Sequence, residues 1–308
     1  MTGDAASEKA GTSEQAGTGG TALVWCAASA ALLVWGATPM VTRVAVLEIE
    51  PSAVGILRTV LAAVLALPLG FALRLARPSG ARQWGQLFVS ALGGFVLFPV
   101  LFGLGVRYTS ASHAALVLAV SPLFTGLIAG AVERRAPSRT WWIGAGLAFA
   151  GEVALVAFRA DIGQTDASLG GDLLVLVACI AAAAGYVAGA RLSRKITTWA
   201  TTFWGIGLGG AILLPLAALR LGPQAWSDAG ALGWSAVIYL ALGSTIVGYI
   251  CWYWALQRGG IARIGATQFA QPVIALGFAV AVLREPLTPP LMLAALLVVA
   301  GVALAQRR

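Results

Sequence analysis

After a polar first segment, the chain alternates long apolar stretches with short polar loops. A transmembrane helix needs about 20 apolar residues to cross roughly 30 Å of hydrocarbon, and ten stretches meet this length. Since no loop is long enough to hold a soluble domain, the pattern predicts an all-α integral membrane protein with ten transmembrane helices. The expected spans are 21–46, 52–73, 84–106, 110–132, 140–158, 172–190, 198–219, 232–256, 264–283 and 287–306.

Residues 1–20 are small and polar, without aromatic residues or periodicity, and we expect a disordered cytoplasmic tail there. The segment does not resemble a secretory signal peptide, because its one basic residue, Lys9, lies far from the first apolar stretch.

The basic residues are distributed unevenly between the two sets of loops. With the N-terminus in the cytoplasm, fourteen Lys and Arg fall in inside segments and four in outside segments. Cytoplasmic loops of membrane proteins carry this excess. The sequence therefore predicts a multi-pass protein with both termini in the cytoplasm.

Composition supports the membrane assignment. Of 308 residues, 59% are hydrophobic and only 10% are charged, against about 25% charged in soluble domains. The net charge of +8 comes from loop clusters, so nucleic acid is not an expected partner, and the lipid bilayer is. The three cysteines lie inside apolar stretches, and a single histidine excludes paired-histidine metal motifs. We expect no cofactor and no metal.

The two halves of the chain resemble each other at an offset near 150 residues. Pro122 matches Pro272, and Glu133 falls close to Glu285. Pro68 with Pro215, Phe102 with Trp252 and Gly151 with Gly301 also agree. Each half, 21–158 and 172–306, holds five predicted spans, so the second enters the membrane in the opposite sense. Inverted five-helix repeats are characteristic of alternating-access transporters.

Short motifs in a fixed order carry a family resemblance. They are Trp35-Gly36, the stretch from Arg58 to Ala62, Tyr108 to Glu133, Gly171-Asp172, Gly243 to Thr245 with Tyr249 and Trp252, and Gln271-Pro272 through Pro286. The chain resembles ten-helix members of the drug/metabolite transporter superfamily that carry two EamA domains. The resemblance covers nearly everything after residue 20. It implies a bacterial inner-membrane transporter that exports small organic metabolites, with amino acid exporters a prominent class. It also implies a central cavity lined by spans one, three, four, six, eight and nine.

The candidate substrate-binding residues lie on these spans. Pro122 and Pro272 remove backbone hydrogen bonds near mid-membrane, which frees carbonyls for a cavity. Ser121, Ser244, Gln268 and Gln271 are neutral donors and acceptors, joined by Thr125 and Thr245. Such groups suit a zwitterion without a fixed charge to trap it. Trp35 and Tyr186, at equivalent places in spans one and six, are candidate cavity walls. The alternative role is a simple kink for the prolines and interhelical hydrogen bonding for the hydroxyls and glutamines. For the aromatic residues it is a lipid-facing or interfacial position.

Several ionisable groups fall inside the spans. Histidine is the side chain whose reference pKa lies near neutrality, so we consider His113 for the cavity, for coupling to protons, or for a hydrogen bond to a neighbour. For Glu152 we favour a structural role, while Arg43 and Arg58 lie toward the outer ends of their spans and are expected to snorkel.

The sequence thus predicts export of small metabolites, most of all neutral or aromatic amino acids, by a protein expected to act as a monomer. A cationic multidrug exporter is the alternative, with Glu152 as its acid. A polytopic membrane enzyme is disfavoured, because paired carboxylates, a histidine pair and an activated nucleophile are all missing from the sequence. Phosphate-ester exchange is disfavoured for want of an inward-facing Lys or Arg at mid-membrane.

Overall fold

The computed structural model describes residues 21–134, 138–157, 168–222, 229–259, 267, 270–284 and 286–305. The tail at 1–20 and Gln268 lie outside these ranges. Every regular element in the described part is helical. The elements are a first helix at 21–36, α2 (Thr38–Glu48), α3 (Pro51–Ala72), α4 (Gly80–Ser90), η1 (Ala91–Leu97), α5 (Phe98–Arg107), α6 (Ala111–Ala119), α7 (Ser121–Glu133), α8 (Arg139–Ala157), α9 (Leu169–Ser193), α10 (Thr198–Arg220), α11 (Ala231–Ile238), η3 (Tyr239–Val247), α12 (Gly248–Gly259), α14 (Ala270–Leu283) and α15 (Pro289–Ala305).

Six continuous helical segments of the described chain are long and apolar enough to cross a bilayer. They are Thr21–Glu48, Pro51–Ala72, Gly80–Arg107, Leu169–Ser193, Thr198–Leu219 and Ala231–Ala255. The other four predicted spans coincide with α6 and α7 together, α8, α14 and α15. The helices therefore lie where the apolar pattern places them, and a total of ten crossings stays a prediction.

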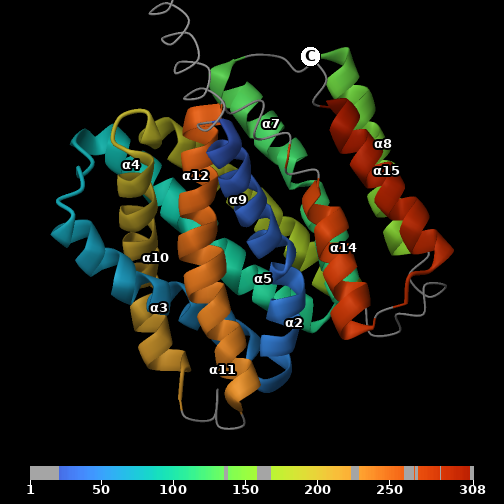
Figure 1. Ribbon diagram of the computed structural model, residues 1–308, viewed down its shortest axis with the longest axis horizontal. Coiled ribbons are helices and arrows are strands. Elements are labelled where there is room, and N and C mark those ends of the chain that lie inside the picture. Colours follow the sequence, from blue (N-terminus) through green and yellow to red (C-terminus); the bar gives the residue numbers. More distant parts are fainter. Residues whose placement is uncertain are drawn as a thin grey trace, which may run out of the picture.

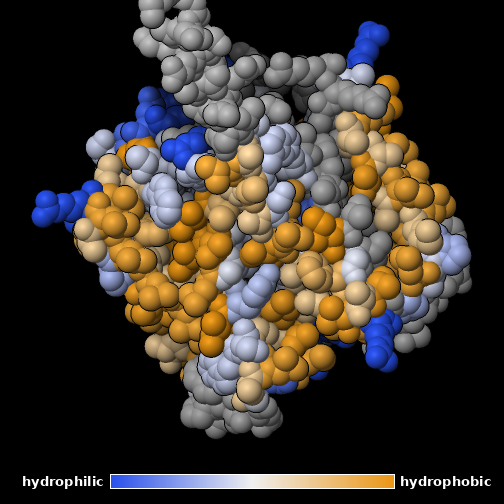
Figure 2. All heavy atoms as spheres, in the orientation of Figure 1, coloured by the Kyte–Doolittle hydropathy of each residue, from blue (hydrophilic) through white to orange (hydrophobic). Residues whose placement is uncertain are grey.

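The surface of the bundle suits a lipid environment. Large hydrophobic side chains such as Leu219, Phe149 and Leu296 are exposed, and Figure 2 shows hydrophobic surface over most of the side in view. In Figure 1 the helix that begins at residue 21 and the end of α15 lie at the same, upper edge of the bundle. A chain that crosses a membrane an even number of times has its two ends on the same side.

Like elements of the two halves pack against each other. α3 packs on α10, α6 on α14, and α8 on α15. α2, in the first span of one half, packs on α11 and η3 of the other, while α9 packs on α4, η1 and α5. The first three of these contacts join like elements of the two halves of the chain.

Two of these pairs run antiparallel. Along α3, Ala63, Leu67 and Gly70 meet α10 at Gly210, Gly207 and Trp204 in turn. In the α8–α15 pair, Gly151 lies against Ala294 and Val298, while Gly301 lies against Gly144 and Ala148. The match between Gly151 and Gly301 in the sequence thus corresponds to one close interface.

Two interruptions also recur in both halves. Within the third helical segment of each half, α-helix changes to π-helix, at η1 and at η3. Pro68 and Pro215 both lie inside their helices, α3 and α10. The fourth predicted span is broken at Val120, between α6 and α7 and two residues before Pro122, as expected for a proline that cannot continue the hydrogen-bond ladder.

Candidate functional site

A polar cluster lies between α3 and η3, at the contact of the two halves. Arg58 of α3 is 5% exposed, and its side chain reaches η3 instead of the bundle surface. Its Nε donates to the Thr245 hydroxyl at 2.8 Å and its Nη2 to the Ser244 hydroxyl at 2.8 Å. The expectation that Arg58 snorkels outward is wrong, because these hydroxyls hold the guanidinium in the interior.

The hydroxyl groups form a connected chain. Ser244 accepts from Arg58 and shares a 3.0 Å hydrogen bond with the Thr38 hydroxyl, in which either oxygen can donate. Thr38 also contacts the Val34 carbonyl at 3.3 Å. Thr245 accepts from Arg58 and donates to the Leu240 carbonyl at 2.8 Å. The chain links the guanidinium to backbone carbonyls of the first helix and of η3.

The π-helical segment explains how two neighbouring residues serve one arginine. The Thr245 hydroxyl bonds the carbonyl five residues earlier, that of Leu240. π-helical segments are uncommon and occur often at functional sites. This one places Ser244 and Thr245 near the middle of the 231–259 helical segment, opposite Arg58.

Aromatic rings adjoin the polar cluster. The Trp35 indole donates from Nε1 to the Ser244 carbonyl at 2.9 Å. Its ring centroid lies 5.2 Å from Tyr249, 5.6 Å from Trp252 and 6.5 Å from Tyr186. The Tyr249 hydroxyl donates to that of Tyr186 at 3.4 Å. Trp35 and Tyr186, predicted as equivalent cavity walls, thus belong to one cluster of rings.

A close helix approach fixes the position of the indole. A Cβ added at Gly248 would lie 2.5 Å from Trp35 Nε1. The absence of a side chain at this position lets α12 lie directly against the ring that bonds the Ser244 carbonyl.

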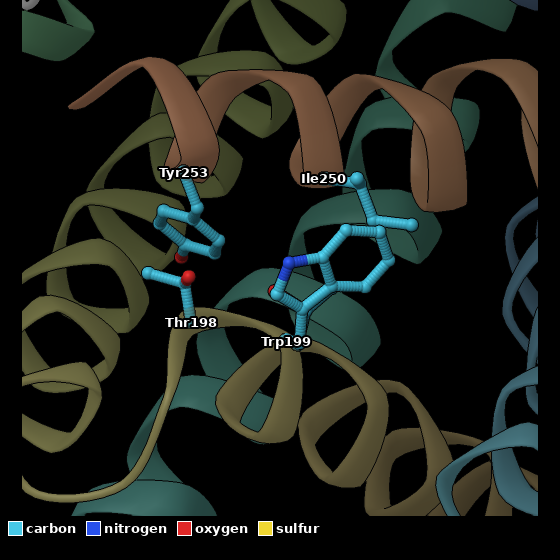
Figure 3. A pocket seen from close by; sticks show the side chains of 5 residues that line it. Thr198, Trp199, Ile250 and Tyr253 are labelled. Atoms are coloured by element: carbon cyan, nitrogen blue, oxygen red, sulfur yellow. The ribbon is translucent and has the colours of Figure 1, made fainter. Parts of the chain in front are cut away.

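The ring cluster continues to a small recess. Tyr253 lies 5.7 Å from Tyr249, centroid to centroid, and lines a narrow recess together with Thr198, Trp199, Thr202 and Ile250. Figure 3 shows Tyr253 and Ile250 reaching from α12 toward Thr198 and Trp199 at the start of α10. The α10 residues that line the recess come shortly after a basic turn in the sequence, at Arg194 and Lys195. We expect this turn to face the cytoplasm.

His113 belongs to a separate polar cluster. Its Nδ1 lies 3.5 Å from Asp172 Oδ2, and Asp172 Oδ1 accepts from the Thr109 hydroxyl at 2.6 Å. His113 is fully buried, and its Nε2 has no hydrogen-bond partner among the described residues. The cluster joins α6, in the fourth span, to the first turn of α9. From the sequence we considered His113 as a cavity residue, and its pairing with Asp172 was not predicted.

The other candidate substrate-binding residues from the sequence lie at the starts of α7 and α14, or outside the described residues. Ser121 opens α7, where its carbonyl accepts from Thr125. Gln271 is the second residue of α14, one turn before Ile274, and Ile274 contacts Gly36 beside Trp35. Residues three apart share a helix face, so Gln271 lies on the side of α14 that approaches the first span. Pro122 and Pro272 lie in the first turns of α7 and α14, and Gln268 lies outside the described residues.

Comparison with known proteins gives the family. The family model described as the EamA-like transporter family matches the chain twice, at residues 22–157 and 169–306. An uncharacterized transporter of Bacillus subtilis, YdeK, is 29% identical over 92% of this chain and 96% of its own length. A protein of Streptantibioticus cattleyicolor named a probable terminal-alkyne amino-acid exporter is 24% identical over 80% of this chain and 79% of its own.

A solved crystal structure superposes on the chain with a TM-score of 0.65 and 22% identity, covering 92% of this chain and 96% of the other. That likeness shows a shared fold. Each of the two matches contains one π-helical interruption, η1 in the first and η3 in the second. The chain belongs to the EamA-like transporter family of the drug/metabolite transporter superfamily, with two EamA repeats.

Proposed function

We propose that this transporter exports small organic metabolites, most of all neutral or aromatic amino acids, across the bacterial plasma membrane by alternating access. The observation that carries the proposal is the antiparallel packing of equivalent helices around a buried polar and aromatic cluster. The α3–α10 and α8–α15 pairs support an inverted repeat, the architecture in which substrate sites lie at the interface between repeats.

The substrate class is supported by the character of the cluster. Trp35, Tyr186, Tyr249 and Trp252 offer apolar walls with polar edges, next to two hydroxyls and a guanidinium. Such a mixture suits a small solute with an apolar side chain and a polar head. The relative named as an amino-acid exporter gives the same direction.

Features at the two ends of the bundle bear on the direction of transport. At the edge reached by the end of α2, Glu48 accepts from the backbone N–H groups of Gly230 and Gly233 at 3.1 and 2.9 Å, which joins α2 to the start of α11. The recess at Tyr253 lies beside the loop expected in the cytoplasm. Substrate enters from that side and leaves when the Glu48 contact opens.

A cationic multidrug exporter fits less well. Its substrate would have to approach a buried guanidinium that has no carboxylate of the described residues beside it, and like charges repel strongly where water is excluded. The only ion pair between described residues is that of His113 with Asp172, in the other cluster.

Counterflow in proteoliposomes tests the proposal. Purified protein is reconstituted into vesicles loaded with unlabelled leucine or phenylalanine, and labelled amino acid is added outside. Accumulation that needs the loaded amino acid supports amino acid transport. Equal uptake in protein-free vesicles, across a panel that includes small and aromatic amino acids, would contradict it.

A further inference from the structure

Arg58 carries a buried charge that the described protein does not neutralise. Its guanidinium group keeps a positive charge in proteins, and the two hydrogen bonds that it donates go to neutral hydroxyls. No acidic side chain of the described residues lies within ion-pair distance of it. A buried charge is costly unless it is paired, and this holds even more strongly inside a membrane.

Packing alone does not account for this arginine. Arg43, the other arginine within a span, donates from Nη1 to the carbonyls of Val106 and Arg107 at 3.0 Å, at the end of α5. Those bonds tie a helix end at the margin of the bundle. Arg58 instead lies in the interior at the contact of the two repeats, held by hydroxyls that orient it.

The orientation leaves one edge of the guanidinium available. Ser244 and Thr245 occupy the edge formed by Nε and Nη2. The edge formed by Nη1 and the second Nη2 hydrogen has no hydrogen-bond acceptor among the described residues. A guanidinium edge of this kind matches the two oxygens of a carboxylate.

We propose that Arg58 is the binding site for the carboxylate of the transported substrate, and that the substrate supplies the counter-charge that the described residues do not provide. The inference rests on the proposed export function, since it assumes that substrate reaches the repeat interface. The rings of Trp35, Tyr186 and Tyr249 then receive the rest of the molecule. A ring face also attracts an ammonium group, so the same cluster accommodates both charged groups of an amino acid.

The cluster selects a monocarboxylate over a phosphate ester. It offers one guanidinium and neutral hydroxyls, and Arg43 is already bonded to carbonyls at the margin. A single positive charge balances a carboxylate, whereas a phosphate dianion would keep an excess negative charge in a low-dielectric site. The sequence-based argument against phosphate esters, the lack of an inward-facing Lys or Arg, is wrong because Arg58 lies in the interior; in this proposal the charge balance disfavours them instead.

The experiment compares three probes that differ only in their charged groups. They are phenylalanine, phenylalaninamide, which lacks the carboxylate, and 3-phenylpropanoate, which lacks the amine. Each is titrated against detergent-solubilised full-length protein, and binding is followed by the shift in thermal unfolding. We expect the two carboxylates to stabilise the parent protein, with an apparent affinity about 10- to 100-fold higher than that of the amide.

Three variants complete the design. Arg58→Gln should bind acid and amide equally weakly, and Arg58→Lys should keep a preference for the acid with reduced affinity, because an ammonium lacks the planar fork. Arg43→Gln is the matched control and should keep the parent preference. Should Arg58→Gln fail to fold, the acid-to-amide ratio of the parent and of Arg58→Lys still decides the matter.

The outcomes separate this inference from the proposed function. A parent protein that binds amide and acid alike, or that no carboxylate stabilises, overturns the role of Arg58, even if counterflow shows amino acid transport. A parent protein that is stabilised by 3-phenylpropanoate through Arg58 but shows no amino acid counterflow keeps the carboxylate site and overturns amino acid export.

Discussion

At the residue scale, the central cluster depends on close contacts as much as on polar groups. Gly248 leaves room for the Trp35 indole, whose N–H holds the Ser244 carbonyl. Gly248→Ala would push the ring away from that carbonyl. We expect transport to fall at least about tenfold and the free energy of unfolding to drop by about 1–3 kcal/mol, the usual effect of overpacking.

The matched control for this change is Gly277→Ala in α14. A Cβ there meets nothing within 4 Å, and alanine favours the helix by about 1 kcal/mol over glycine. Transport and stability should be kept or slightly improved. Flux and chemical denaturation measured on both variants decide the point, and equal losses in the two would remove the special role of the Trp35 contact.

His113 and Asp172 allow a test of proton coupling. Both are buried, and only a charged histidine would pair electrostatically with the carboxylate. If the pair couples transport to protons, His113→Gln and Asp172→Asn should each remove the pH dependence of flux and keep some downhill transport. Flux from about pH 5.5 to 8 brackets the ordinary histidine pKa.

Two results would contradict proton coupling by His113 and Asp172. Variants that keep the parent pH profile but lose stability would make the pair a structural joint between α6 and α9. A variant that matches the parent protein in affinity, stability and pH profile would remove any role for His113.

At the scale of elements, two acidic caps near each other have different expected effects. Glu50 caps α3 within its own repeat, bonding Ser52 and Ala53 N–H, whereas Glu48 caps α11 of the other repeat. A lost cap costs about 1 kcal/mol, so both Glu48→Ala and Glu50→Ala should lower stability by about that amount. Only Glu48→Ala should also favour the outward-open state.

Exchange kinetics would reveal this difference. We expect Glu48→Ala to raise the rate of counterflow, or to allow flux when no substrate is present on the opposite side of the membrane. Glu50→Ala should keep the parent kinetics. Identical kinetics in the two variants would show that the Glu48 contact is a cap and nothing more.

Helix positions were predictable from the sequence because apolar length decides them. Each predicted span coincides with a helix of the described chain, and the break beside Pro122 lies where proline chemistry puts it. The π-helical segments η1 and η3 could not be predicted, since a register change of one residue leaves no mark in an evenly apolar stretch.

Side-chain partners were harder to predict than helices. Arg58 looked like a snorkelling residue because it is the eighth residue of α3 and near its outer end. The packing of α3 against η3 turns the Arg58 side chain inward. The tilt and packing of a helix cannot be read from a single sequence. The matched motifs Gly243 to Thr245 and Arg58 to Ala62 were a usable signal, because both partners of the contact lay in segments already singled out.

For the molecule as a whole, the proposed mechanism requires that the Arg58–Ser244 cluster be reached alternately from both sides of the membrane. Packing between like elements of the two repeats offers equivalent contacts to exchange, and the cluster lies where the repeats meet. Because Ser244 is fully buried in the present conformation, alternating access through the cluster requires that it become accessible in other states.

Thiol labelling at this position measures that accessibility directly. Ser244→Cys is placed in a chain whose three native cysteines, Cys26, Cys179 and Cys251, are replaced by alanine, and a membrane-impermeant reagent is applied from either face of oriented vesicles. We expect labelling from each face and protection by phenylalanine in both cases. Labelling from neither face, or from one face only whatever the substrate and its gradient, would contradict alternating access through this cluster.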